Sequence, residues 1–220
     1  MMKNMRKNKD VGIYGLTAKW YDKNSRKSRL TQMQNYANEV ASFVNTPANV
    51  LEIAPGPGYL AIALAKKGFN VTGVELSPDF VKIENNNADE ANVTVDFKEG
   101  NADHLPCEDH FFDFVICSAA FKNFKDPVKA LCEMHRVLKK GGTSLIIDMN
   151  KDATSEDINN EIRETGMKGF DKHFVKFAFK TFLKQGAYSE TDFESLLSET
   201  PFKNYTIKKE GISLFVYLHK

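Results

Sequence analysis

The chain has 220 residues, of which 42 % are apolar, a length and composition that favour a single globular domain and exclude wholesale disorder. No stretch approaches the roughly 20 apolar residues that span a bilayer, and the charged N-terminus has no apolar run behind it, so neither a membrane span nor a secretory signal is expected. The three cysteines form no C-x-x-C pair, which argues against a disulfide framework or a structural zinc site. We therefore expect a cytoplasmic protein without a bound metal.

The net charge of +1 is unevenly distributed along the chain. Residues 1–29 hold nine lysines and arginines against two acids, a net charge of about +7 that leaves about −6 on the remainder. A basic arm on an acidic body suits contact with a nucleic acid or an anionic substrate, and it equally suits a solvated chain terminus. A nucleic-acid partner is therefore open but not favoured, and nothing in the pattern indicates an oligomeric state.

Apolar side chains at helical spacing predict an amphipathic helix over residues 30–44, ended by Asn45-Thr46-Pro47. From residue 49 onward, strands and helices alternate. The predicted strands cover residues 50–54, 70–75, 93–98, 111–117 and 143–149. The helices between them cover residues 59–67, a segment that begins at Pro78 with Ser77 as its N-cap, and residues 127–139, stopped by Gly141-Gly142. Repeated units of this kind predict a parallel, doubly wound sheet.

The end of the chain departs from this alternation. Residues 151–200 have the pattern of about three helices, and residues 204–209 and 213–219 have the pattern of two strands separated by only three residues. So short a link forces an antiparallel pair. The predicted fold class is therefore α/β, with a Rossmann-like, doubly wound sheet of seven strands that is mostly parallel and ends in an antiparallel C-terminal hairpin.

The strand, turn and helix at residues 50–67 carry the strongest chemical signal. The turn Pro55-Gly56-Pro57-Gly58 lets a ligand approach the backbone, and the helix after it offers free N–H groups. Glu75, at the end of the next strand, can accept both hydroxyls of a ribose. These features fit NAD and S-adenosylmethionine equally well, but the run from Ala54 to Ala61 does not match the dinucleotide fingerprint G-x-G-x-x-G.

The segment Glu52-Ile53-Ala54-Pro55-Gly56-Pro57-Gly58 resembles motif I of the class I S-adenosylmethionine-dependent methyltransferases, an acidic residue followed by G-x-G-x-G. Three more segments are similar to that family, in the family's order: residues 100–106, residues 112–117, and residues 133–142, which resemble its RVLKPGG segment. The resemblance covers roughly residues 36–150. It looks closest to the small-molecule group that includes the ubiquinone and menaquinone C-methyltransferases.

This resemblance implies that the chain binds S-adenosylmethionine, releases S-adenosylhomocysteine and methylates a small-molecule acceptor, which we expect to be aromatic or hydrophobic. Glu52 and the backbone beside Ser118 would hold the methionine end, Glu75 the ribose, and Asn101 the adenine. The full set of cofactor-binding residues that the resemblance implies is Tyr21, Glu52, Ala54, Gly56, Gly58, Glu75, Leu76, Asn101, Ala102, Ser118 and Ala119.

Two of these residues depart from the family pattern. Ala54 stands where the first glycine of motif I usually lies, and Asn101 stands where aspartate is more common, although its side-chain oxygen can still accept from the adenine amino group. Tyr21 lies in Trp20-Tyr21-Asp22, in a segment that often folds over the cofactor in this family, where it would bond the methionine carboxylate. Plain packing against the first helix is the alternative for Tyr21.

The predicted organisation is a basic N-terminal arm, residues 1–29, that can serve as a cofactor lid, followed by a single methyltransferase domain, residues 30–220. A helical insertion at about residues 151–188 would build the acceptor side. Within it, lysines recur every four residues and phenylalanines occupy the other face: Lys172, Lys176, Lys180 and Lys184, and Phe170, Phe174, Phe177 and Phe182. This pattern suits an aromatic-lined lid for an anionic or membrane-associated acceptor, and equally an ordinary amphipathic helix.

The sequence assigns no catalytic residue. No histidine has a carboxylate at a spacing that indicates a general base, and His135 lies on the apolar side of its helix, where packing is its simplest role. No N/D-P-P-Y motif follows the fourth strand, which disfavours methylation of adenine N6 or glutamine. Two rival functions stay open: an RNA or protein methyltransferase, supported by the basic arm, and a non-catalytic cofactor-binding protein, supported by Ala54 and the missing base.

Overall fold

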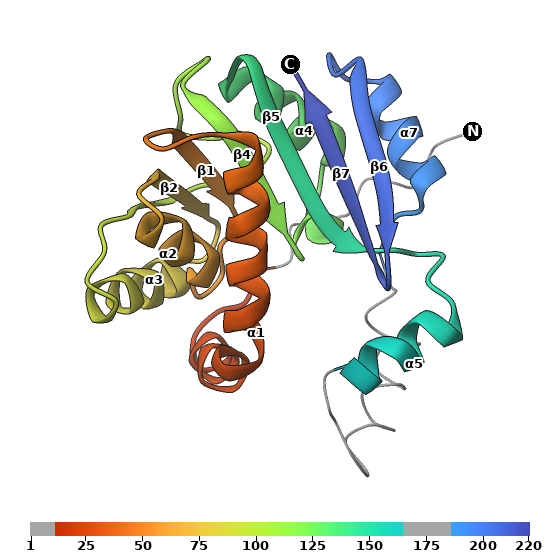
Figure 1. The fold of residues 1–220 in the computed structure, drawn as a ribbon. Coiled ribbons are helices and arrows are strands. Elements are labelled where there is room, and N and C mark those ends of the chain that lie inside the picture. Colours follow the sequence, from red (N-terminus) through yellow and green to blue (C-terminus); the bar gives the residue numbers. More distant parts are fainter. Residues whose placement is uncertain (1–11, 165–185) are drawn as a thin grey trace.

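A seven-stranded mixed sheet forms the centre of the computed structural model, which describes residues 12–164 and 186–220 (Figure 1). The strand order is β3-β2-β1-β4-β5-β7-β6. The strands are β1 (Asn49–Ile53), β2 (Asn70–Glu75), β3 (Asp96–Glu99), β4 (Phe112–Ser118), β5 (Leu138–Met149), β6 (Asn204–Glu210) and β7 (Ser213–His219). The first five strands pair in parallel, whereas β7 pairs antiparallel with both β5 and β6. The predicted fold class is confirmed.

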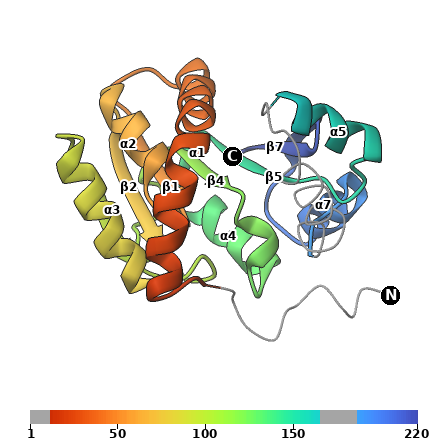
Figure 2. The ribbon, with the colours of Figure 1, turned by 90° about the horizontal axis from the view of Figure 1, so that it is seen from below.

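Helices cover both faces of this sheet, because alternate side chains of each strand point to opposite faces. In β4, Phe114 and Ile116 join an apolar cluster with α1 (Leu16–Phe43) and α2 (Tyr59–Lys66). Val115 and Cys117 join a second cluster with α4 (Pro127–Val137) and α7 (Glu190–Ser198). The remaining helix of the first face, α3 (Pro78–Glu90), packs against α1 and α2, as Figure 2 shows from below. The result is three layers with the sheet in the middle.

The first helix begins at Leu16 and not at residue 30, so the predicted start of the helix was wrong. Part of the predicted basic arm is therefore helical. Little in the sequence indicates this, because the outer side of the added turns carries Leu16 and Trp20, which are 84 % and 64 % exposed, and Ala18 is the one fully buried residue among those of the added turns whose burial is described. Polar contacts of Asp22 and Arg26 with α2 and α3 hold these turns in place. Residues 1–11 of the arm lie outside the described part.

The junction between α4 and β5 also differs from the prediction. The helix was expected to reach Lys139 and to be stopped by Gly141-Gly142, but α4 ends at Val137 and the strand begins at Leu138, which is fully buried. Pairing with the end of the chain favours the strand. The Gly141 N–H donates to the Lys220 carbonyl at 2.9 Å, and the Lys220 N–H donates to the Gly142 carbonyl at 3.1 Å. In addition, β3 begins at Asp96 and not at Val93.

Residues 151–200 are not wholly helical as predicted. Their described part holds α5 (Ser155–Glu164) and α7, but Tyr188 lies in an isolated parallel bridge with Asn150. The lysine and phenylalanine pattern of residues 168–184 lies outside the described residues. Among the helices of residues 12–164 and 186–220, none is long and apolar enough to cross a membrane.

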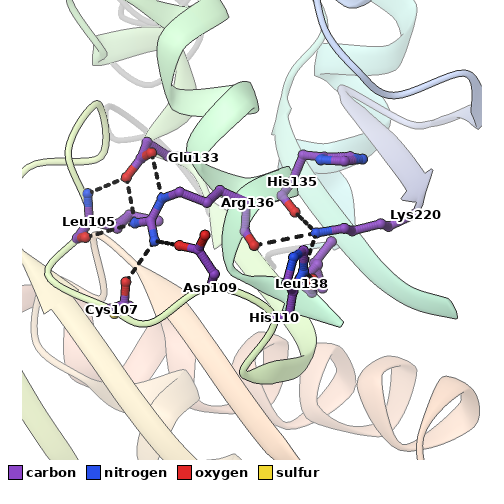
Figure 3. A network of polar contacts seen from close by, with 9 residues as sticks. All are labelled: Leu105, Cys107, Asp109, His110, Glu133, His135, Arg136, Leu138 and Lys220. Atoms are coloured by element: carbon purple, nitrogen blue, oxygen red, sulfur yellow. Dashed lines mark hydrogen bonds and ion pairs between the residues drawn. The ribbon is translucent and has the colours of Figure 1, made fainter. Parts of the chain in front are cut away.

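A guanidinium clamp fixes the segment that follows β3 onto α4 (Figure 3). Arg136 forms a bidentate pair with Glu133, with both N···O distances at 2.8 Å, and reaches Asp109 at 2.6 Å. Its other donors bond the carbonyls of Leu105 and Cys107 at 3.0 and 2.8 Å, so all five N–H groups of the guanidinium have partners. Glu133 also accepts the Leu105 N–H at 2.8 Å. The clamp therefore binds both the N–H group and the carbonyl group of Leu105.

We expect Arg136→Lys to lower the free energy of unfolding by about 2 kcal/mol, because an ammonium cannot reproduce the planar fork and leaves carbonyls unpaired. Urea denaturation of both proteins measures this difference. The matched control is Lys139→Met, which removes one partly exposed ion pair with Asp113 at the same end of the sheet and should cost under about 1 kcal/mol. Equal losses of unfolding free energy in the two variants would show that the Arg136 contacts stabilise the protein no more than one exposed ion pair does.

Candidate cofactor site

The candidate site lies at the carboxyl ends of β1, β2 and β4. Because the strand order reverses between β1 and β4, the loops after these two strands leave the sheet toward opposite faces and open a crevice between them. Two adjoining hollows occupy this crevice, with volumes of about 430 and 670 Å³. Both volumes include space that is open to solvent.

Most of the predicted cofactor residues meet in this crevice. Those that line one or both hollows are Tyr21, Ala54, Gly56, Glu75, Leu76, Asn101, Ala102, Ser118 and Ala119. Glu52 and Gly58 line neither of the two hollows. The fold thus brings nine of the eleven predicted residues together from five separate stretches of the chain, while their individual roles stay predictions.

The two glycines of the turn serve different purposes. Both have left-handed backbones, with φ of +60° at Gly56 and +78° at Gly58. A Cβ at Gly56 would meet nothing within 4 Å, whereas a Cβ at Gly58 would lie 3.1 Å from Phe97 and 3.3 Å from Glu84. Gly56 therefore leaves free space beside the crevice, and Gly58 allows the turn to pack closely on its own domain.

Two alanines at the crevice have a backbone conformation that normally favours glycine. Ala54 follows β1 and Ala119 follows β4, and each has φ of +56°. A side chain in this region costs roughly 1–2 kcal/mol. The alanine at the first glycine position of motif I therefore preserves the turn but adds strain, and strain of this kind is often found at functional sites.

We expect Ala54→Gly to raise the free energy of unfolding by about 0.5 kcal/mol, because relief of the left-handed strain exceeds the added entropy of the unfolded chain. The control is Ala61→Gly in α2, where the backbone is helical and the methyl group is fully buried. That change should cost about 1–2 kcal/mol. Thermal and urea unfolding measure the stability of both variants. A loss of stability in Ala54→Gly would show that the backbone of Ala54 is not strained.

Glu75 is held as a fixed acceptor at the edge of the crevice. Its side chain is only 6 % exposed, and its two oxygens accept the Ser77 N–H at 2.9 Å and the Gly56 N–H at 3.1 Å. Burial raises the pKa of this carboxyl, while the same backbone donors act in the opposite direction. Each oxygen keeps capacity for a further hydrogen bond. The carboxylate is therefore positioned to receive hydroxyl groups of a ligand.

Two further buried acids lie behind the glycine turn. Glu52, 2 % exposed, has one oxygen without a partner in the described structure, and burial raises its pKa to about 8. Glu84 of α3 is fully buried, and neither of its oxygens has a partner among the described residues. Burial, followed by repulsion from Glu75 and Glu52, raises the Glu84 pKa to about 10. Sequence reasoning missed Glu84, although its spacing of four from the buried Phe80 marks an inward face.

We expect Glu84→Gln to stabilise the protein at pH 8–9 and to have little effect near pH 4. The folded state keeps a proton on Glu84 that the unfolded state releases above its ordinary pKa of 4.5, so stability falls as the pH rises from 4.5 toward 10. The loss amounts to at most about 1.4 kcal/mol per pH unit. Urea denaturation across this pH range measures it.

The control for this experiment is Glu194→Gln, an exposed change on α7. It should leave the pH dependence of stability as in the unchanged protein. A Glu84→Gln variant whose stability runs parallel to that of the unchanged protein at every pH would show that Glu84 is not protonated in the folded state.

Arg29 is a site residue that the sequence did not single out, because it was counted only as one charge of the basic arm. It lines the second hollow, and its guanidinium donates to the Tyr21 hydroxyl at 2.6 Å. Its positive charge also acts against the rise in pKa that burial causes at Glu52. Tyr21 and Arg29 thus present a hydroxyl and a cation together at the crevice.

A third hollow, with about 1,370 Å³ of space that is partly open to solvent, adjoins the crevice. It shares with the second hollow the residues Ile13, Tyr21, Arg29, Ala119 and Asn123. Its further walls combine apolar, phenolic and charged side chains: Tyr36, Lys122, Ile147, Asp148, Met149, Glu161 and Ile212. We call this hollow the side chamber. It provides space for a second molecule beside a ligand of the crevice.

Two other expectations can be compared with the structure. His135 packs edge-on against Phe202, with ring centroids 5.0 Å apart, which agrees with a packing role. Within the described ranges, no group of three or more histidine, cysteine, aspartate or glutamate residues could hold a metal ion.

Comparison with known proteins agrees with this geometry. Residues 51–146 match the family model described as a methyltransferase domain. A crystal structure of a putative S-adenosyl-L-methionine-dependent methyltransferase from Methanococcus maripaludis superimposes with a TM-score of 0.75 at 23 % identity, covering 97 % of this chain and 96 % of that one. Residues 51–146 are thus similar to a methyltransferase domain, and the chain has the fold of that methyltransferase, as its motifs predict.

Among curated relatives, a demethylmenaquinone methyltransferase of Deinococcus radiodurans is 32 % identical over 109 residues, 49 % of this chain and 45 % of that protein. A ubiquinone biosynthesis O-methyltransferase of Xanthomonas campestris is 30 % identical over 139 residues, 62 % of this chain and 58 % of that protein. The chain thus spans about half the length of the curated relatives that it matches.

Proposed function

We propose that this protein transfers the methyl group of S-adenosylmethionine to a small-molecule acceptor that binds in the side chamber. The observation that carries the proposal is the crevice at the ends of β1, β2 and β4, which holds a buried carboxylate and opens into a second hollow. A cofactor and an acceptor need two adjoining sites, and this arrangement supplies them.

The residues present fit S-adenosylmethionine. Glu75 offers fixed oxygens to the two ribose hydroxyls, and Asn101, with Ala102 beside it, lines the part of the crevice that suits the adenine. The empty space beside Gly56 lets the methionine part approach the backbone. Tyr21 and Arg29 together suit the carboxylate of that part, since a guanidinium and a hydroxyl are both donors.

The chemistry asked of the protein is alignment. When bound, the cofactor supplies a methyl group already activated by a sulfonium centre. The chain has to hold the acceptor atom in line with that methyl group and to exclude water from the path. Ala119 and Asn123 line both the crevice and the side chamber, and so lie where the two molecules would meet.

The walls of the side chamber support an acceptor of mixed character. Ile147, Met149 and Ile212 suit an aromatic or hydrophobic body, whereas Tyr36 and Lys122 suit polar substituents on it. The names of the two curated relatives, a demethylmenaquinone methyltransferase and a ubiquinone biosynthesis O-methyltransferase, both refer to quinones. We therefore extend the proposal to a small aromatic acceptor with polar substituents.

Calorimetric titration with S-adenosylmethionine tests the cofactor assignment. We expect micromolar binding to the unchanged protein, no binding of NAD, and a loss of roughly 10- to 100-fold in affinity for Glu75→Gln, because an amide replaces one fixed acceptor by a donor. The control is Glu99→Gln. Glu99 is exposed and pairs with Glu75 in the register of the neighbouring strand, so this variant should bind S-adenosylmethionine as the unchanged protein does. No binding of S-adenosylmethionine to the unchanged protein would overturn the proposal.

A further inference from the structure

A buried amide connects the glycine turn to the first helix. The Asn87 side chain of α3 is 6 % exposed, and its Nδ2 donates to the Pro57 carbonyl at 2.9 Å and to Asp22 Oδ1 at 3.1 Å. Its Oδ1 accepts from the Arg26 guanidinium. Both amide hydrogens and the amide oxygen are therefore in use. Three hydrogen bonds tie the backbone of the turn to α1 through one side chain.

Asp22 and Arg26 extend this junction to α2 and to the end of α3. Asp22 Oδ1 also accepts the Tyr59 hydroxyl at 2.5 Å, and that hydroxyl lies 2.9 Å from the Asp22 carbonyl oxygen. Arg26 pairs with Glu90 at 3.1 Å. Burial and the bond to Asp22 raise the pKa of Tyr59, so the phenol stays a donor at neutral pH. We call Asp22, Arg26, Tyr59 and Asn87 the junction network.

The part of α1 that the network holds is the part that borders the crevice. Tyr21 is adjacent to Asp22, and Arg29 lies one turn beyond Arg26 on the same helix. The apolar Leu16 and Trp20 of these turns face solvent and contribute little to their attachment. Figure 2 shows this end of α1 running alongside α3, away from the helical stretch that packs on the sheet. The hydrogen bonds and ion pairs of the junction network therefore provide much of the attachment of this segment to α2 and α3.

We propose that Asn87 is a positioning residue that couples the glycine turn to the first half of α1, so that ligand binding at the turn and seating of Tyr21 and Arg29 over the crevice strengthen each other. The inference rests on the proposed cofactor site. Its physical basis is that loss of the amide leaves the buried Pro57 carbonyl and Asp22 short of donors, which is costly where water is excluded. Coupling of this kind is reciprocal by thermodynamic necessity.

The test uses the single tryptophan of the chain, Trp20, which lies on the held segment. Stopped-flow fluorescence measures the dissociation rate of S-adenosylhomocysteine, and hydrogen exchange measures the opening of residues 16–29 with and without that ligand. We expect Asn87→Ala to speed dissociation about ten-fold and to weaken the protection that the ligand gives to residues 16–29. The matched control is Asn85→Ala, two residues away on the same helix, where an exposed amide bonds only its own helix at the Val81 carbonyl; it should change neither quantity.

Substitution of Asp22 separates positioning from general stability. Asp22→Asn keeps an oxygen that can accept from Tyr59 and Asn87 and should stay within about three-fold of the unchanged dissociation rate, whereas Asp22→Leu should behave like Asn87→Ala. A lower melting temperature in Asn87→Ala with unchanged dissociation and unchanged exchange of residues 16–29 would overturn the inference alone. Failure of the unchanged protein to bind S-adenosylhomocysteine would overturn the proposed function as well.

Discussion

The reversal of strand order between β1 and β4 is the constraint on which the rest of the site depends. Neighbouring parallel strands that send their loops to opposite faces leave a gap at their carboxyl ends that no loop can close. The chain must turn sharply at both exits, and it does so at Ala54 and Ala119, whose backbones share the same left-handed φ. The crevice and the strain at its rim thus have one topological origin.

The electrostatics of the crevice follow from this geometry. The ends of β1 and β2 carry Glu52 and Glu75 into the interior, and α3 adds Glu84 from below the turn. Burial raises the pKa values of all three, repulsion between the acids adds to this at Glu52 and Glu84, and Arg29 acts in the opposite direction at Glu52. With pKa values of about 8 and about 10, Glu52 and Glu84 stay protonated at neutral pH and add no negative charge behind the turn.

The sequence predicted the parts of the molecule that local pattern encodes. Strand alternation, the glycine turn and the motif order predicted the fold class. Glu75 was expected at the crevice because it ends a predicted strand, and Asn101 because its segment resembles one of the family; both line the crevice. The parts that it missed depend on distant partners. The early start of α1 depends on Asp22 and Arg26 meeting α2 and α3, and the early start of β5 depends on Lys220, which pairs with it from the far end of the chain. Glu84 was missed for a different reason: its spacing from Phe80 marks an inward face, but a glutamate on a helix is ordinarily solvated.

The single helix α1 serves two regions that are otherwise separate. In Figure 1 the stretch of α1 that packs on the sheet is seen from the side and its N-terminal stretch nearly end-on, whereas Figure 2 shows the reverse, so the helix changes direction between the two. Met33, Ala37 and Val40 lie in the apolar layer on the sheet, whereas Tyr21 and Arg29 border the crevice. Because no loop separates the two stretches, a shift of the one that packs on the sheet moves the one that borders the crevice. Selection on the core residues of this helix is therefore also selection on how the crevice is bordered.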